Sequence, residues 1–134
     1  MKITSTWKEG FKSIVDNGRD HDITMDLPYL QHGKDEGPTA LEVSVMGYAG
    51  CITTIYKMMA DKMKLQLSAM KCELIAEKGE ATIERVQINL HVTSDAPESK
   101  LQKAFEMTAN NCPVGVLFIQ AGVKVEPEIT ISRP

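Results

Sequence analysis

Polar and apolar side chains alternate at the start of the chain and predict three short β-strands. The alternating segments are rich in β-branched residues and lie at about 2–7, 11–15 and 22–27. Asp16-Asn17-Gly18, between the second and third segments, is a strong turn signal because these residue types tolerate left-handed backbone conformations. The pattern favours an antiparallel meander of three strands.

A long helical pattern follows a polar loop. Thr39, with Glu42 three residues later, has the capping-box spelling of a helix start. From about 40 to 65, apolar side chains recur at helical spacing and cover more than one stripe, which predicts a helix buried on most sides. Gly47 and Gly50 each cost about 1 kcal/mol relative to alanine inside a helix. We therefore expect another backbone or a ligand to approach the helix closely at these two positions.

The rest of the chain predicts two strands, two helices and a final strand. Strands are expected at 68–76 and 81–93, helices at about 97–109 and 113–119, and the last strand at 124–131. Pro97 and Pro113 both suit the first turn of a helix. The resulting order, β-β-β-α-β-β-α-α-β, indicates an α+β fold with antiparallel pairing. No repeat or linker marks a boundary, so we expect residues 1–134 to form a single domain.

The overall composition narrows the classes of function. The 134 residues are 43% apolar and 25% charged, as in globular proteins, and the net charge is −3 without a cluster of Lys or Arg. A nucleic-acid partner is therefore not expected. The start of the chain has no apolar secretory segment, and polar residues interrupt every long apolar run. We therefore expect a cytoplasmic protein without membrane contact.

The three cysteines are the best candidates for chemistry. Their odd number argues against a disulfide framework, and without a Cys-x-x-Cys pair or a neighbouring histidine we expect neither a metal site nor a cofactor. Cys112 directly precedes a helix, and the positive N-terminal end of a helix lowers the pKa of a thiol there, which favours a reactive thiolate. The alternative interpretation is that Cys112 is only a small apolar residue at a helix start. Cys51 lies mid-helix beside glycines that open space next to its sulfur, which favours a reactive thiol. The alternative interpretation is an inert thiol in the hydrophobic core. Cys72, on an expected strand, is interpreted as structural or incidental.

Two sequence stretches around these cysteines resemble the motifs of a known family. Residues 37–51 read Gly-Pro-Thr-Ala-Leu-Glu-Val-Ser-Val-Met-Gly-Tyr-Ala-Gly-Cys, and residues 111–114 read Asn-Cys-Pro-Val. They are similar to the Gly-Pro-Ser-Pro-x-Glu-Leu-Leu-Leu-x-x-Leu-Gly-Gly-Cys and Cys-Pro-Val motifs of the OsmC/Ohr family of osmotically inducible and organic-hydroperoxide-resistance proteins. The resemblance extends from about residue 2 to 131.

This resemblance implies an OsmC-like fold, with an antiparallel sheet and an intertwined homodimer that has a long buried helix from each subunit at its centre and active sites at the subunit interface. It also implies a thiol-dependent peroxidase. Cys51 would attack an organic hydroperoxide and become a sulfenic acid, Cys112 would resolve it to a disulfide, and an external dithiol would reduce the pair. Met46, Tyr48, Tyr56 and Phe118 would supply apolar surroundings suited to such a substrate.

Two positions bear on the catalytic expectation. Family peroxidases carry an arginine near the start of the chain that stabilises the attacking thiolate, whereas the matching residues 6–11 contain no arginine. Arg19 lies too far along the chain to take this role. Only Lys8 or Lys12 offers a positive charge there, and lysine lacks the bidentate geometry of arginine. Glu42 matches the glutamate of the OsmC-like subgroup. Nine residues of helix place it about 13.5 Å from Cys51 on the opposite face, so Glu42 either caps the helix or acts across a dimer interface.

The sequence leaves three functions open. The first is reduction of organic hydroperoxides through Cys51 and Cys112. The second is a dimeric small-molecule binding protein on the same fold, in which the cysteines do not turn over. The third retains the cysteine chemistry but directs it to another electrophile, for instance a persulfide.

Overall fold

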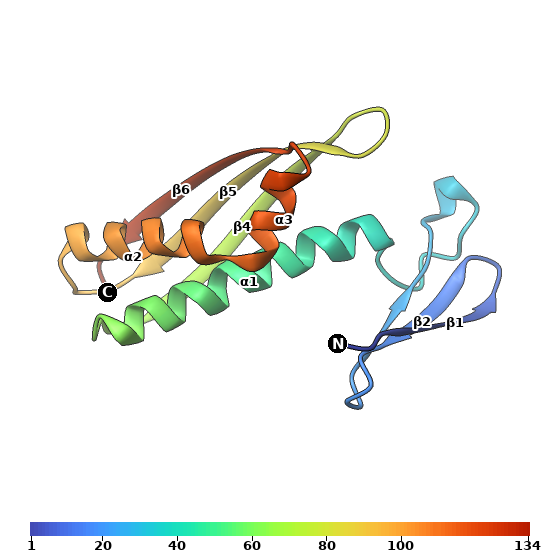
Figure 1. The fold of residues 1–134 in the computed structure, drawn as a ribbon, viewed down its shortest axis with the longest axis horizontal. Helices are drawn as coiled ribbons and strands as arrows, with labels where there is room; N and C mark the ends of the chain where they lie inside the picture. The colour runs from blue at the N-terminus through green and yellow to red at the C-terminus, as the bar shows by residue number, and fades with distance from the viewer. The chain divides into compact units, whose positions relative to one another are not determined.

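The computed structural model describes all residues from Met1 to Pro134 and has the predicted element order, with one short 3-10 helix added (Figure 1). The chain divides into two compact units, Met1–Ser44 and Val45–Pro134. None of its helices combines the length and the apolar character needed to cross a lipid bilayer.

The unit Met1–Ser44 contains the predicted three-stranded sheet. Its strands are β1 (Thr4–Glu9), β2 (Lys12–Asp16) and β3 (Asp22–Met25). They pair antiparallel in the order β1-β2-β3, which confirms the meander. At the predicted turn, the Asp16 carboxylate accepts a hydrogen bond from the backbone N–H of Gly18 at 3.0 Å, and Gly18 has the positive φ of 70° that glycine adopts without strain.

A buried carboxylate organises the loop after β3. Asp26 accepts hydrogen bonds from the backbone N–H groups of Leu27 at 2.8 Å, Lys34 at 3.0 Å and Glu36 at 3.2 Å. Burial raises the pKa of Asp26, but the three backbone donors outweigh it and the net pKa is below the ordinary value. The added 3-10 helix, η1 (Tyr29–Gln31), lies within this loop. The loop is therefore held by polar contacts to a single side chain.

The unit Met1–Ser44 buries no hydrophobic side chain, and Asp26 is its one buried residue. Seven of its large hydrophobic side chains are exposed, namely Met1, Ile3, Trp7, Phe11, Ile23, Tyr29 and Leu30. A three-stranded sheet normally needs a covered hydrophobic face for stability. This unit therefore lacks, within its own residues, the core that usually stabilises such a sheet.

The unit Val45–Pro134 contains a second three-stranded sheet of β4 (Ala69–Lys78), β5 (Ile83–Thr93) and β6 (Lys124–Ser132). The order is β4-β5-β6; β4 and β5 are antiparallel, whereas β5 and β6 are parallel. The prediction of antiparallel pairing throughout is therefore wrong for the last strand. The two helices between β5 and β6 form a crossover connection, which brings the chain back to the end of the sheet where β5 began.

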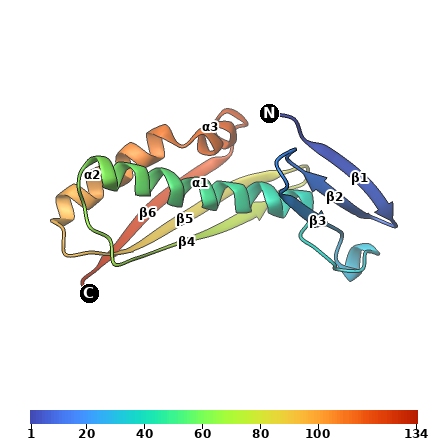
Figure 2. The same cartoon turned by 90° about the horizontal axis from the view of Figure 1, so that it is seen from below.

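Three helices accompany this sheet: α1 (Ala40–Lys62), α2 (Glu98–Asn111) and α3 (Pro113–Gln120). The part of α1 within this unit and α2 lie on the same face of the sheet (Figure 2). The Tyr56 hydroxyl of α1 donates to the backbone carbonyl of Leu101 in α2 at 3.3 Å. Alternate residues of β5 are buried beneath the helices, among them Val86, Ile88, Leu90 and Val92. This is the hydrophobic core of the chain.

Helix α1 buries a single stripe within this chain. Only Tyr48, Ile52, Tyr56 and Ala60 are buried, at a spacing of four residues. The expectation of burial on most sides is therefore not met by contacts of the chain with itself. An added Cβ would meet nothing within 4 Å at either Gly47 or Gly50, so the close approach expected at these glycines is also missing here.

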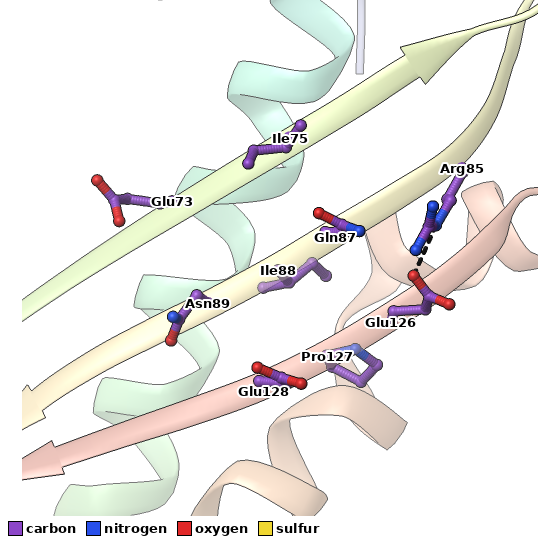
Figure 3. A pocket seen from close by; sticks show the side chains of 9 residues that line it. All are labelled: Glu73, Ile75, Arg85, Gln87, Ile88, Asn89, Glu126, Pro127 and Glu128. Carbon is purple, nitrogen blue, oxygen red and sulfur yellow. Dashed lines mark hydrogen bonds and ion pairs between the residues drawn. The ribbon is translucent and has the colours of Figure 1, made fainter.

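The sheet face opposite the helices is open and polar. A groove of about 610 Å³ lies across it, lined by Glu73, Ile75, Arg85, Gln87, Ile88, Asn89, Glu126, Pro127 and Glu128 (Figure 3). Arg85 donates to Glu126 at 2.6 Å inside the groove. Glu73, also in the groove, pairs with Lys71 and His91 beside it, and such exposed charged groups are typical of a solvated sheet face.

Candidate active site

Cys51 and Cys112 lie together in the unit Val45–Pro134. Cys51 is on α1 and half-buried, and Cys112 is fully buried at the start of α3. Their Sγ atoms are 2.7 Å apart, with Cys112 as the hydrogen-bond donor and Cys51 as the acceptor, and both thiols are free. A disulfide bond is about 2.05 Å long, so only a small movement separates the pair from a covalent link. The structure thus brings together the two cysteines that the sequence motifs singled out.

The local sequence places Cys112 at a helix N-terminus, as predicted. Cys112 is the N-cap of α3, Pro113 takes the first helical position, and the Cys112 Sγ accepts from the backbone N–H of Gly115 at 3.3 Å. The predicted lowering of the Cys112 pKa is wrong. Burial and the hydrogen bond with Cys51 raise the pKa of Cys112 to about 11, and the helix N–H groups offset only part of this rise.

Tyr48 covers the N-terminus of α3 next to the cysteine pair. It precedes Cys51 by three residues, so the two side chains share one face of α1. The Tyr48 ring lies 4.9 Å from the ring of Phe118, centroid to centroid, at 39°. It also packs against Gly115, where an added Cβ would come within 2.9 Å of the Tyr48 hydroxyl oxygen. Burial, with a smaller contribution from the nearby cysteine thiolates, raises the pKa of Tyr48 to about 12.

The other residues of the expected apolar surroundings differ in their placement. Phe118 is beside Tyr48, as described above, but Tyr56 bonds to α2 and Met46 is 55% exposed. Cys72 is half-buried on β4, on the face of the sheet that carries Leu90 in the neighbouring strand. Burial raises its pKa to about 11, and the structure gives it no bond to another thiol. Its interpretation as structural or incidental stays a prediction.

Glu42 makes the predicted capping box. Its carboxylate accepts from the backbone N–H of Thr39 at 2.7 Å, and the Thr39 hydroxyl oxygen accepts from the backbone N–H of Glu42 at 3.2 Å. Glu42 is exposed and belongs to the unit Met1–Ser44, whereas Cys51 belongs to the other unit. Its position on the chain is therefore explained by helix capping, and its catalytic role stays a prediction.

Lys12, one of the two lysines that offer a positive charge where the family carries its arginine, is already paired. Lys12 contacts Glu9 at 3.2 Å and Glu36 at 2.9 Å, all within the unit Met1–Ser44. These carboxylates raise the pKa of Lys12, with Glu36 the larger cause. Lys8 lies on β1, where every side chain is exposed.

The two arginines of the unit Val45–Pro134 are bound away from the thiols. Arg85 pairs with Glu126 on the open sheet face, and Arg133 donates to the backbone carbonyls of Ser94 and Ala96 at 2.9 and 2.7 Å. No group of three His, Cys, Asp or Glu side chains in the structure is placed to hold a metal ion.

The sequence analysis did not identify the arrangement of Tyr48 over Gly115. Two spacings carried a signal for it, because Tyr48 lies three residues before Cys51 and Gly115 lies three residues after Cys112. In helices, a separation of three places side chains on one face. Joining the two spacings requires knowing that α1 and α3 meet at the cysteines, which only the fold provides.

Both a family model and solved structures relate this chain to OsmC-like proteins. The family described as OsmC-like protein matches residues 33–128, whereas no curated protein matches the sequence significantly. An OsmC-like protein from Mycoplasma pneumoniae is 15% identical, with a TM-score of 0.86 over 97% of this chain and 95% of that chain. The organic hydroperoxide resistance protein OhrB of Bacillus subtilis is 17% identical, with a TM-score of 0.65 over 96% of each chain.

A third solved structure, described as an organic hydroperoxide resistance protein OsmC from Legionella pneumophila, is 14% identical, with a TM-score of 0.69 over 97% of each chain. At these identities the solved structures establish a shared fold. The family match covers most of the chain and includes both cysteines that meet in the structure. The chain belongs to the OsmC-like protein family.

Proposed function

We propose that this protein is a thiol-dependent peroxidase that reduces organic hydroperoxides through Cys51 and Cys112. The observation that carries the proposal is the 2.7 Å distance between their sulfur atoms, because a resolving thiol must reach an oxidised partner. Solved structures of the same fold include proteins described as organic hydroperoxide resistance proteins, which supports the same class of substrate here.

The first chemical step takes place at Cys51. Its thiolate attacks the terminal oxygen of the hydroperoxide, so that an S–O bond forms as the O–O bond breaks. The electron pair of the O–O bond leaves with the alkoxide, which takes up the proton lost by Cys51 and becomes an alcohol. Cys51 is the attacking sulfur because it is half-buried and accepts the hydrogen bond, whereas Cys112 is fully buried and donates it.

The second step joins the two sulfurs. Cys112 attacks the sulfur of the Cys51 sulfenic acid, an S–S bond forms, and the hydroxyl group leaves as water with the Cys112 proton. The pKa of about 11 keeps Cys112 protonated before this step, so it does not compete with Cys51 for the peroxide. An external dithiol then reduces the disulfide by thiol exchange and is itself oxidised.

We infer further that the working form is a homodimer. The unit Met1–Ser44 buries no hydrophobic side chain, and α1 leaves open space at Gly47 and Gly50. Both features suit a surface that is covered by another chain, and a second copy of this chain satisfies them without a further partner. A soluble monomer rarely leaves this much apolar surface uncovered.

Peroxide consumption tests the catalytic proposal. The protein is mixed with cumene hydroperoxide and dithiothreitol, and the wild type is compared with Cys51→Ser, Cys112→Ser and the control Cys72→Ser. We expect Cys51→Ser to abolish turnover, Cys112→Ser to accumulate a sulfenic acid that dimedone traps, and Cys72→Ser to match the wild type. Equal turnover by Cys51→Ser and the wild type would contradict the proposal and favour the binding-protein alternative.

Sedimentation equilibrium tests the dimer. We expect a mass of twice 14.8 kDa for the wild type. Gly47→Leu creates no clash within the chain and introduces a good helix former, so it leaves the fold of the chain intact. In a packed dimer it raises the dissociation constant at least tenfold, whereas Glu106→Leu, on the exposed side of α2, does not. A wild-type mass of 14.8 kDa would contradict the homodimer.

A further inference from the structure

One buried polar group near the cysteines has no partner in the structure. Tyr48 is 3% exposed, and its hydroxyl makes no hydrogen bond. Yet no sealed side-chain oxygen or nitrogen of the protein lacks a hydrogen-bond partner, so the small exposed part of Tyr48 includes the hydroxyl. The ring is therefore buried while its hydroxyl keeps a small accessible surface.

The position of this hydroxyl relative to the two sulfurs follows from short contacts. The hydroxyl lies against Gly115, since a Cβ there would come within 2.9 Å of it. The backbone N–H of Gly115 is 3.3 Å from the Cys112 Sγ, which is 2.7 Å from the Cys51 Sγ. Tyr48 and Cys51 also share one face of α1. The Tyr48 hydroxyl and the sulfur pair thus both lie at the first turn of α3.

The Tyr48 side chain is held in place and stays a hydrogen-bond donor. Phe118 stacks on one part of the ring and Gly115 packs on another, so the ring cannot swing away without breaking both contacts. With a pKa of about 12, the phenol is protonated at any pH at which the protein would work. A fixed, protonated hydroxyl is well suited to stabilise developing negative charge.

We propose that the Tyr48 hydroxyl donates a hydrogen bond to the hydroperoxide oxygen that leaves as alkoxide when Cys51 attacks, an inference that rests on the peroxidase function proposed above. The O–O bond breaks toward this oxygen, so the negative charge develops there in the transition state. The Gly115 N–H already binds the Cys112 sulfur, and Arg85 and Arg133 are bound elsewhere. The Tyr48 hydroxyl, in contrast, lies against Gly115 and makes no hydrogen bond within the chain.

The variant pair Tyr48→Phe and Tyr56→Phe tests this proposal. Both substitutions remove one phenolic oxygen from α1 and keep the ring, but the Tyr56 hydroxyl bonds to Leu101 in the hydrophobic core and does not contact Gly115. Stopped-flow measurement gives the rate constant for Cys51 oxidation by cumene hydroperoxide in a single turnover. We expect Tyr48→Phe to lower it roughly tenfold to a hundredfold, and Tyr56→Phe to leave it within twofold.

A second reagent separates this role from a structural one. Iodoacetamide alkylates Cys51 without an oxygen leaving group, so its rate should be the same in Tyr48→Phe and the wild type. Unchanged peroxide rates in Tyr48→Phe, or equal losses with peroxide and iodoacetamide, would overturn the assignment while leaving the peroxidase proposal intact. A wild type that alkylates but does not react with the hydroperoxide would instead overturn the peroxidase proposal itself, and this one with it.

Discussion

The two units of the chain are stabilised by different kinds of contact. The unit Val45–Pro134 has a hydrophobic core in which Leu90, Val92 and Leu101 are fully buried between sheet and helices. The unit Met1–Ser44 buries only Asp26, and its loop is held by three hydrogen bonds to that carboxylate. Both contain a three-stranded sheet, so the difference lies in what covers the sheet.

The two units also differ in the roles that they suit, because only one of them contains the cysteine pair. The cysteine pair, Tyr48 and Gly115 all belong to the unit with the core, where packing fixes side chains closely enough for two sulfurs to meet. The other unit presents exposed apolar side chains on a polar framework, which suits a surface for association. In the proposed peroxidase, residues 45–134 would hold the reacting atoms, and the exposed apolar side chains of residues 1–44 would add to the dimer contacts proposed at Gly47 and Gly50.

The largest expected effect comes from removing core volume. Leu90→Ala should lower the free energy of unfolding by about 3 kcal/mol, because Leu90 is fully buried and its loss leaves a cavity. Ile23→Ala, in the sheet of the other unit, should cost less than about 1 kcal/mol in the monomer, since Ile23 is already 43% exposed. Urea denaturation at low protein concentration measures both. Equal losses would show that the two sheets are buried alike.

Asp26 offers the corresponding test in the unit Met1–Ser44. Asp26→Ala leaves three backbone N–H groups without their acceptor and should destabilise the loop by about 2 kcal/mol. Hydrogen exchange measures this locally, as faster exchange at Leu27, Lys34 and Glu36 with little change in β5. Asp26→Asn retains one acceptor oxygen and should have a smaller effect. Uniform acceleration across both units would contradict the separation described above.

Local features of the sequence predicted much of the fold and part of the site. The Thr39–Glu42 capping box and the Cys112–Pro113 helix start depend on residues a few positions apart, and both are present as predicted. The approximate bounds of the elements were predicted for the same reason. Motif resemblance also identified the two cysteines that the structure brings together.

Features that depend on residues distant in the chain were not predictable in this way. The parallel pairing of β6 with β5 is decided by how the crossover packs, not by the pattern within either strand. The pKa of Cys112 depends on burial by elements far along the chain, which reverses the effect of its own helix end. Asp26 likewise acts through residues eight and ten positions away, and nothing in its neighbourhood signals a buried carboxylate.

The smallest expected effect is an alkaline loss of stability centred on the unit with the core. Burial raises the pKa of Cys72 and of Cys112 from 9.0 to about 11 in the folded protein. Between these values the folded state binds more protons than the unfolded state, so the free energy of unfolding falls as pH rises from 9 to 11. For the half-buried Cys72, a shift of this size would correspond to about 2.7 kcal/mol without screening, and solvent screening reduces it to the order of 1 kcal/mol.

Cys72→Ser isolates one of these contributions at a position without a proposed catalytic role. Urea denaturation of the reduced protein at pH 8, 9, 10 and 11 should show a steady loss for the wild type and a shallower one for Cys72→Ser. In the unit Met1–Ser44 the paired Lys12, whose raised pKa lies above 10.5, adds a loss only at the upper end of this range. A loss that is identical in both proteins would contradict the assignment to Cys72, since the buried Tyr48 and Tyr56, whose pKa values are raised to about 12, and the paired Lys12 also lose protons at the upper end of this range.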